Sequence, residues 1–418
     1  MIILAIDTSC DDTCCSILEV QDSQFKIRSN IVSSQVKIHQ KYGGVYPTLA
    51  KREHQRNLAL VLKESLLRAR LLKSKVKSQV FRGPHSAGSR MGQESKIQLK
   101  TQKLKEILKR EEILYKKLKR FLVKYQKPRI DIIAVTIGPG LEPCLWQGVN
   151  FARALAFWWN LPVVPVNHIE AHIFANWLAP ISEKSKVKSQ KSKIQIKNQK
   201  IEFPAVCLVV SGGHTQLILT RRIGNYKIIG ETRDDAAGEC FDKTARILGL
   251  PYPGGPSVAK MATKIKIQKS KIKDIKLPRP MINSKNYDFS FSGLKTAVLY
   301  DFKKRPKEVR SSKEYVREMA REIQQAIIDV LIKKTIKAAR DYRVKSILLG
   351  GGVAANDELR KQFQSKIKNL KLKINFLVPP KNLCTDNATM VGVAGYFNRK
   401  KATKNYQKIK ALPDLRIT

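Results

Sequence analysis

Apolar runs and polar turns follow the same order in the two halves of the chain. Residues 2–6 and 15–20 are apolar runs on either side of a polar turn, a pattern that predicts a β-hairpin. Ala205–Val210 and 216–220 repeat the plan around the glycine-containing turn 211–215. The sequence therefore predicts two lobes, each of which opens with a hairpin.

The remaining segments have the periodicities of further helices and strands. Apolar positions at helical spacing predict helices at 51–72, 145–159, 168–177, 240–248, 292–301 and 313–342, and another that begins near Asp357. Short apolar runs predict strands at 130–137, 163–166 and 346–349. We expect an α/β protein with the two-lobed actin-like and Hsp70-like (ASKHA) fold, in which each lobe is ribonuclease-H-like and the lobes enclose a nucleotide cleft.

Three lysine-rich stretches at 73–127, 183–201 and 264–276 interrupt this plan. The heptapeptide KSKVKSQ occurs at 73–79 and again at 184–190, which is typical of inserted low-complexity sequence. We interpret most of these residues as solvated loops, with additional RNA affinity as the functional alternative. One part differs, because its apolar helical face predicts a helix packed on the first lobe or on a partner. That helix is expected at 104–125, with Leu104, Leu108, Tyr115, Leu118, Leu122 and Tyr125 on its apolar face.

These patterns divide the chain into two lobes. The first lobe is predicted at 1–165, carries the insertion 73–127 and is completed by a C-terminal helix at 388–418. The second lobe is predicted at 166–387 and carries the other two insertions. A chain of 418 residues is long enough for two lobes, because single hydrophobic cores stop growing near about 250–300 residues.

The charge balance of the chain is strongly basic. Lys and Arg total 80 against 34 Asp and Glu, a formal net charge of +46, which favours a polyanionic partner: nucleic acid first, an anionic membrane second. The apolar runs are too short to cross a bilayer and the N-terminus does not resemble a signal peptide, which excludes the membrane. Seven cysteines without a CxxC pair favour reduced thiols and a cytoplasmic location.

The sharpest local signal is the pair His168 and His172, which lie four residues apart and therefore on one helix face. A zinc peptidase is disfavoured, because the acid between them is Glu170, about 200° around the helix from the first histidine. The best third ligand is Asp386, in a polar loop before an apolar helix, although helix capping would also explain it. Two histidines and one carboxylate suit Fe(II), with Zn(II) as the alternative.

Glycine-rich turns and clustered acids form the second signal. The turns at 211–213, 254–255 and 350–352 allow backbone N–H groups to approach an anion, and together they favour a nucleotide cleft. None matches the phosphate loop GxxxxGK[ST] or the dinucleotide fingerprint GxGxxG. Asp11 and Asp12 occupy the first hairpin turn and are candidates for proton transfer. Turn chemistry explains other acids of the chain, but Asp242 falls inside a predicted helix.

Taken together, the motifs of the chain resemble those of the tRNA N6-adenosine threonylcarbamoyltransferase family over nearly its whole length outside the insertions. The matching segments are IDTSCDDT at 6–13, YGGV at 42–45, GPGL at 138–141, HIEAH at 168–172, SGGHTQ at 211–216, DDAAGE at 234–239, FDK at 241–243, YPGGP at 252–256, FSFSGLK at 289–295, GGVAAN at 351–356 and CTDN at 384–387. Asp12 stands where many members have Glu, which shortens the reach of that carboxylate.

The resemblance implies transfer of threonylcarbamoyl from threonylcarbamoyl-AMP to the N6 amine of adenosine 37 in tRNAs that read codons beginning with A, with release of AMP. It implies one divalent metal ion on His168, His172 and Asp386. The implied adenylate-binding residues are Val209, Val210, Ser211, Gly212, Gly213, Asp242, Gly255 and Asn356. The implied partners are tRNA, a paralogous dimerisation subunit and a small ATPase.

Two other functions remain open on the same fold. A sugar or acyl kinase would need a base aimed at a substrate hydroxyl and would not need the metal set. A non-catalytic partner subunit, like the degenerate paralogue of the bacterial enzyme, would lack the metal residues that this chain retains.

Overall fold

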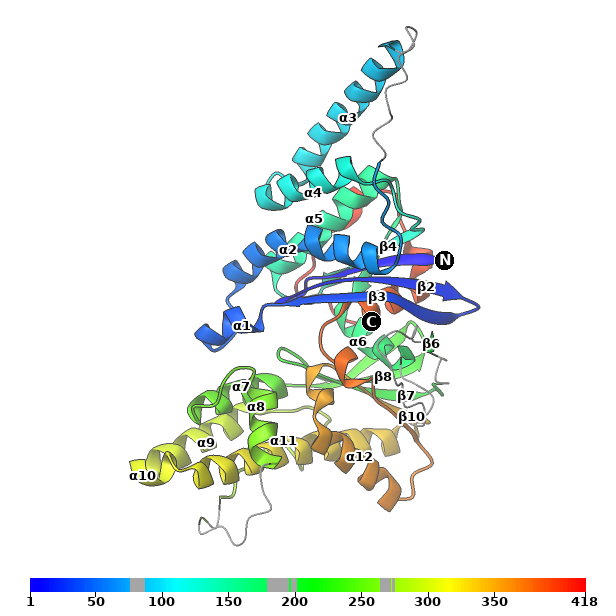
Figure 1. The fold of residues 1–418 in the computed structure, drawn as a ribbon. Coiled ribbons are helices and arrows are strands. Elements are labelled where there is room, and N and C mark those ends of the chain that lie inside the picture. The colour runs from blue at the N-terminus through cyan, green and yellow to red at the C-terminus, as the bar shows by residue number, and fades with distance from the viewer. Residues whose placement is uncertain (76–86, 179–194, 197–200, 264–271, 273–274) are drawn as a thin grey trace.

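The computed structural model describes residues 1–75, 87–178, 195–196, 201–263, 272 and 275–418. Two mixed β-sheets form the centres of two lobes, one above the other in Figure 1. Most of the stretches 183–201 and 264–276 lie outside the described residues.

The first sheet has six strands in the order β5-β4-β1-β2-β3-β6. β1 pairs antiparallel with β2 and parallel with β4, which pairs parallel with β5. Its strands are β1 (Ile2–Asp7), β2 (Asp12–Gln21), β3 (Gln24–Ser34), β4 (Ile132–Gly138), β5 (Val163–Asn167) and β6 (Gln195–Ile196).

The second sheet repeats this plan in the order β11-β10-β7-β8-β9, with β7 antiparallel to β8 and parallel to β10. Its strands are β7 (Ala205–Val210), β8 (Thr215–Arg222), β9 (Asn225–Glu231), β10 (Ser346–Gly350) and β11 (Asn375–Leu377). Each lobe therefore has the ribonuclease-H-like order of three antiparallel strands followed by two parallel ones. The predicted two-lobed α/β fold is confirmed.

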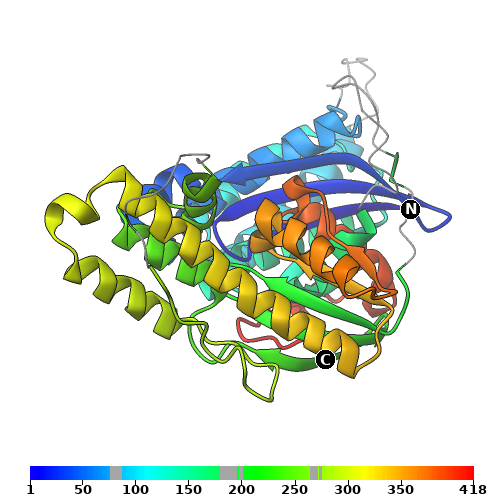
Figure 2. The ribbon, with the colours of Figure 1, turned by 90° about the horizontal axis from the view of Figure 1, so that it is seen from below.

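Helices cover both sheets and fill the space between them. In the first lobe these are α1 (Val36–His39), α2 (Pro47–Arg68), α3 (Ala87–Ile107), α4 (Glu112–Lys124) and α5 (Glu142–Trp159). In the second they are α7 (Ala237–Ile247), α8 (Gly254–Thr263), α9 (Ser292–Lys304), α10 (Lys307–Arg310), α11 (Lys313–Asp341) and α12 (Asp357–Asn369). Figure 2 shows α11 running along the length of the second lobe.

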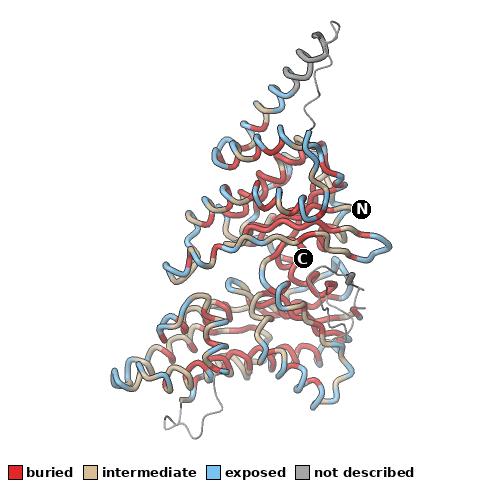
Figure 3. The backbone as a smooth tube through the Cα atoms, in the orientation of Figure 1, coloured by how far each residue is buried: buried red, intermediate tan, exposed pale blue. Residues whose placement is uncertain are grey.

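Two further helices, α6 (His168–Phe174) and α13 (Ala388–Phe397), form the layer between the sheets. α6 contacts β7 and β10 of the second sheet, α13 contacts β1 and β2 of the first, and the two helices contact each other. Successive side chains of a strand point to opposite faces of the sheet. Cys207 and Val209 of β7 therefore face the layer of α6 and α13, whereas Val206 and Leu208 face α11 on the other side. Figure 3 shows buried residues concentrated in and between the sheets.

Two predicted helices differ from the structure. The helix expected at 104–125 is two helices, because α3 ends at Ile107 and α4 begins only at Glu112. The break accommodates Glu111, which turns inward and accepts a hydrogen bond from Asn150. The leucines of the predicted face, Leu104, Leu108, Leu118 and Leu122, are nevertheless buried, and α4 packs on α2.

The helix expected at 388–418 ends at Phe397, and the rest of the chain forms short 3-10 turns and extended segments. The reason is that this part of the chain bonds to the first sheet instead of to itself. Thr403 forms a bridge with Val163 at the edge of that sheet, and the Leu412 amide donates to the carbonyl of Ile137.

Candidate metal centre

The histidine pair is positioned by the start of α6, directly after β5. The side chain of Asn167 caps this helix by accepting hydrogen bonds from the amides of Ile169 and Glu170 at 2.8 and 3.2 Å. His168 and His172 then lie one turn apart, with ring centroids 4.6 Å apart. α6 approaches the end of β10 closely because Gly350 has no Cβ, which would lie 2.8 Å from the His172 carbonyl oxygen.

Asp386 reaches the same point from the loop before α13, although 214 residues separate it from His172 along the chain. One ligand atom from each of His168, His172 and Asp386 lies within 4.8 Å of the other two. Asp386 Oδ1 is 3.4 Å from His168 Nε2 and 3.3 Å from His172 Nε2. Two atoms bound to one ion at about 2.1 Å are about 3.0–3.4 Å apart, so both separations fit ligands of a single metal.

Burial makes this group costly without a bound cation. His168 and His172 are 6% and 1% exposed, and neither ring nitrogen of His172 has a hydrogen-bond partner among the described residues. Buried polar atoms without partners are rare in proteins, because each loses its hydration on folding. A divalent cation would take one nitrogen from each imidazole together with the carboxylate, so the donor set fits Fe(II) or Zn(II).

The three groups perturb one another's pKa values. Burial would raise the pKa of Asp386, but the two imidazoles hold it well below its usual range. Burial opposes protonation of His168, whereas Asp386 and Asp7 outweigh it and raise the pKa of that ring to about 9. Burial and the neighbouring His168 lower the pKa of His172. The site is therefore held together by opposite charges, with both imidazoles buried and Asp386 partly exposed.

Glu170 takes no part in this group, as the helical spacing predicts. Its two carboxylate oxygens accept hydrogen bonds from the Tyr226 hydroxyl at 2.9 Å and from the Asn398 amide at 2.8 Å. Glu170 is therefore not placed like the general base of a zinc peptidase.

Asp7 also belongs to the site, a role that is not predicted from the sequence pattern. It is fully buried at the end of β1, and its Oδ2 lies 3.6 Å from Nδ1 of His168, on the side opposite Asp386. Carboxylates in this position orient metal-binding histidines in many proteins. The sequence does carry a signal for this role. Asp7 directly follows the predicted strand 2–6 and lies within the IDTSCDDT segment.

The glycine-rich turns gather at the carboxyl ends of the parallel strands β7 and β10. Val209 and Val210 are buried in β7, so only their backbone can face a ligand. Gly212 and Gly213 follow, with no atom within 4 Å of where a Cβ would be, so this turn borders open space. Gly351 has φ +86° and lies against the Val210 carbonyl, which brings the second turn beside the first.

Two candidate adenylate residues already bond within the protein. Asp242 Oδ1 accepts from the Gly254 amide at 2.6 Å, at the start of α8, and burial raises the pKa of Asp242 to about 6. Asn356 caps α12 through the Leu359 amide and donates to Gln324 at 2.8 Å. Both therefore position the turns beside them, and Gly255 lies next to Gly254 with open space around it.

Asp11 and Asp12 lie at the start of β2, on the loop that leads from Asp7. Burial, followed by the charges of Asp11 and Asp386, raises the pKa of Asp12 to about 7. Burial likewise raises the pKa of Asp11. A carboxylate that titrates near neutral pH is suited to accept and release a proton.

Fold and site together define a two-lobed α/β protein of the ASKHA class with a buried His-His-Asp group between its lobes. A family model described as tRNA N6-adenosine threonylcarbamoyltransferase matches residues 26–81 and 112–393. A protein of that name from Thermosipho africanus is 38% identical over 417 residues, covering 100% of both chains. Its counterpart in Bacillus subtilis is 36% identical over 421 residues, covering 100% of this chain and 96% of that one. The chain belongs to this family and is an acyltransferase.

Solved structures resemble the chain more distantly. A ROK hexokinase from Thermus thermophilus is 11% identical, covers 96% of this chain and 99% of its own, and superposes with a TM-score of 0.41.

Proposed function

We propose that the enzyme transfers threonylcarbamoyl from threonylcarbamoyl-AMP to the N6 amine of adenosine 37 in tRNAs that read codons beginning with A, and releases AMP. The observation that carries the proposal is the convergence of His168, His172 and Asp386 between the lobes, beside the glycine-rich turns. Relatives across the whole chain length carry the name of this activity. The net charge of +46 suits a tRNA substrate.

In this proposal His168, His172 and Asp386 hold one divalent cation, Fe(II) or alternatively Zn(II). When bound, the ion supplies a positive charge that orients and polarises an oxygen of the activated carbamoyl group. Asp7 acts behind His168, where its carboxylate faces Nδ1 and favours the orientation in which Nε2 points at Asp386.

The adenylate occupies the turns of the second lobe. Backbone amides of Gly212 and Gly213 approach the phosphate, and Asp242, Gly255 and Asn356 shape the surface around the nucleoside. AMP is a good leaving group in a mixed anhydride, so positioning contributes more to the rate than a strong general acid does.

The attacking amine must lose a proton when the new carbamoyl bond forms. Asp11 and Asp12 are the candidate acceptors, and Asp12, with a pKa of about 7, can both accept and release it near neutral pH. We also propose that the enzyme acts in the cytoplasm with a paralogous dimerisation subunit and a small ATPase. Among the described residues no helix is long and apolar enough to cross a membrane.

The test combines product analysis with a matched pair of variants on one helix. Wild-type protein is incubated with its partners, threonylcarbamoyl-AMP and unmodified tRNA, and the digested nucleosides are analysed by mass spectrometry. His168→Ala is expected to lose both bound metal and product, whereas Glu170→Gln, two residues away but directed at Tyr226 and Asn398, keeps both.

Full activity of His168→Ala would remove the metal from the mechanism. Failure of the wild type to form product, combined with transfer of phosphate from ATP to a small molecule, would establish the kinase alternative.

A further inference from the structure

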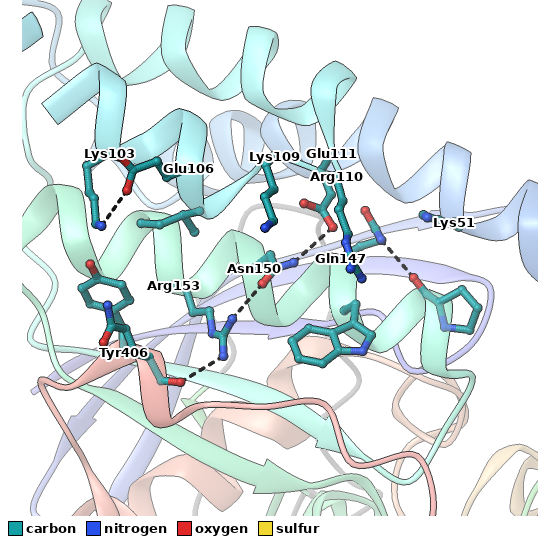
Figure 4. A pocket seen from close by; sticks show the side chains of 14 residues that line it. Lys51, Lys103, Glu106, Lys109, Arg110, Glu111, Gln147, Asn150, Arg153 and Tyr406 are labelled. Carbon is teal, nitrogen blue, oxygen red and sulfur yellow. Dashed lines mark hydrogen bonds and ion pairs between the residues drawn. The ribbon is translucent and has the colours of Figure 1, made fainter. Parts of the chain in front are cut away.

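A cavity of about 450 Å³ lies on the first lobe, away from the metal centre, between the α3–α4 turn, α5 and the C-terminal segment. This volume is within the range of small-ligand sites. Figure 4 shows Glu111 and its neighbours on the α3–α4 turn directed toward Gln147, Asn150 and Arg153 of α5. The lining residues used below are Lys51, Lys103, Glu106, Lys109, Arg110, Glu111, Trp146, Gln147, Asn150, Arg153, Tyr406 and Gln407.

Basic side chains form a large part of the cavity lining. Lys103 is paired with Glu106 at 2.6 Å. Lys51, Lys109 and Arg110 instead have no ion pair and no side-chain hydrogen bond in the part of the chain that the structure describes. The charge of Glu111 acts on Lys51 and Arg110, but the cavity lining has five basic side chains against two carboxylates, an excess that favours an anionic ligand such as phosphate.

The inner wall has hydrogen-bonding atoms that the protein leaves unused. Glu111 is 2% exposed; its Oε1 accepts from Asn150 at 3.1 Å, but its Oε2 has no partner among the described residues. Oε1 of the buried Gln147 likewise has no hydrogen-bond partner among the described residues. Burial raises the pKa of Glu111, so a ligand that donates hydrogen bonds here would relieve an unfavourable carboxylate. Bases with amino groups are such donors.

An aromatic ring completes the lining. Trp146 is partly exposed, lies 5.4 Å from the guanidinium of Arg153, and donates from its indole N–H to Glu142 at 3.4 Å. Basic groups beside an aromatic ring are the usual combination for unpaired nucleotides, whose bases stack while their phosphates are neutralised.

The walls of the cavity differ in how they relate to the family match, since α5 falls within the matched residues. The family model matches 26–81 and 112–393, so Lys103–Glu111, which forms one wall, and Tyr406 and Gln407 fall outside it.

The opposite wall, α5, leads back to the loop between β1 and β2, which follows Asp7. α5 follows Leu141, whose amide donates to Ser9, and the Thr8 hydroxyl donates to Cys144 in the first turn of α5. From Cys144 to Arg153 the helix rises by about 14 Å. An RNA held at the metal centre could therefore continue along α5 into the cavity.

We propose that this cavity binds an unpaired nucleotide of the RNA substrate outside the catalytic cleft, with its phosphate at Lys51, Lys109 and Arg110 and its base against Trp146 and Glu111. The proposal rests on the proposed function for the identity of the RNA. A free nucleotide has the same chemistry, but the contacts that link α5 to the loop between β1 and β2, beside the metal centre, favour RNA.

The test compares two charge reversals of equal size. Lys109→Glu/Arg110→Glu changes the exposed pair that follows α3, and Lys303→Glu/Lys304→Glu changes an exposed pair in the last turn of α9 in the second lobe. Affinity for an unmodified tRNA transcript is measured at several salt concentrations. The pocket variant is expected to bind at least tenfold more weakly than the control, with the slope of log K against log salt reduced by about two.

The same proteins are assayed for nucleoside modification with tRNA varied. The pocket variant should raise KM for tRNA and leave kcat unchanged, because the lysine and arginine do not touch the reacting atoms. Equal affinities and KM values for the two variants would overturn the pocket proposal while an active wild type leaves the proposed function intact; an inactive wild type would overturn the proposed function instead.

Equilibrium dialysis with GMP and AMP separates the two sources of the ligand. A GMP or AMP site that the wild type and the α9 variant share and the pocket variant lacks would assign the cavity to a free nucleotide and overturn the RNA assignment. Equal nucleotide binding by all three proteins supports it.

Discussion

Acidification from pH 6.5 to about 4 should destabilise the protein, and one measurable part of this effect comes from the buried imidazole of His54. This ring is fully buried on α2, where its Nε2 lies 2.9 Å from the Cys10 carbonyl oxygen and its Nδ1 lies 2.8 Å from the Thr13 hydroxyl. A carbonyl only accepts, so Nε2 carries the proton and donates it, while Nδ1 accepts from Thr13. Burial lowers the pKa of His54 from 6.5 to about 4.

The direction of the change in the free energy of unfolding depends on which state, folded or unfolded, binds the proton at the higher pH. Below pH 6.5 the unfolded chain protonates this histidine, whereas the folded chain resists until about pH 4, so the free energy of unfolding falls as pH falls through this window. A difference of about 2.5 between the two pKa values corresponds to about 3 kcal/mol. The whole of this contribution is present above pH 6.5.

Urea unfolding of wild type and His54→Gln at pH values from 7 to 4 measures this contribution. The glutamine amide can donate to Cys10 but does not titrate, so the wild type should lose about 3 kcal/mol more than the variant over this range. Asp12 and Asp242, whose raised pKa values contribute with the opposite sign, are present in both proteins and cancel in the difference. Parallel stability curves for the two proteins would refute the reasoning.

Three further outcomes are expected. Leu118→Ala removes a fully buried side chain of α4 and should lower the free energy of unfolding by about 3 kcal/mol, whereas Ile113→Ala on the same helix, 38% exposed, should change it by less than about 1 kcal/mol; urea unfolding measures both. Gly351→Ala places a Cβ 2.3 Å from the Val210 carbonyl at a positive φ and should lower the melting temperature by several degrees, while Gly213→Ala, with open space around it, should not. A chelator should lower the melting temperature of the wild type and leave that of His172→Ala unchanged, as followed by scanning fluorimetry, because only the wild type gains stability from a bound ion.

The predictable part of the fold comes from local periodicity. The apolar runs that became β1, β4, β7 and β10 are covered on both faces, so almost every residue in them is apolar and the strands are plain in the sequence. β3 and β9 were missed because exposed or half-exposed polar residues interrupt them, and they pair at or near sheet edges. A strand that buries little leaves little trace in the pattern of hydrophobicity.

The candidate site likewise has a part that local sequence geometry predicts and a part that depends on tertiary contacts. The shared face of His168 and His172 and the outward direction of Glu170 follow from helical geometry alone. The role of Asn356 as a helix cap depends on backbone geometry, and the burial of Glu111 depends on a tertiary contact with Asn150. A buried glutamate in a lysine-rich segment has the sequence signature of solvated surface, so the cavity beside it could not be foreseen.

The position of the metal centre follows from the duplication of the sheet. α6 comes directly after β5 and α13 comes after β11, which occupy equivalent positions in the two strand orders. Each helix packs against the sheet of the other lobe, α6 on β7 and β10 and α13 on β1 and β2. The two histidines and Asp386 are therefore brought together only when the lobes are correctly docked. A cation bound to all three opposes separation of the lobes, so metal binding and closure of the cleft are thermodynamically coupled: each stabilises the other by the same free energy.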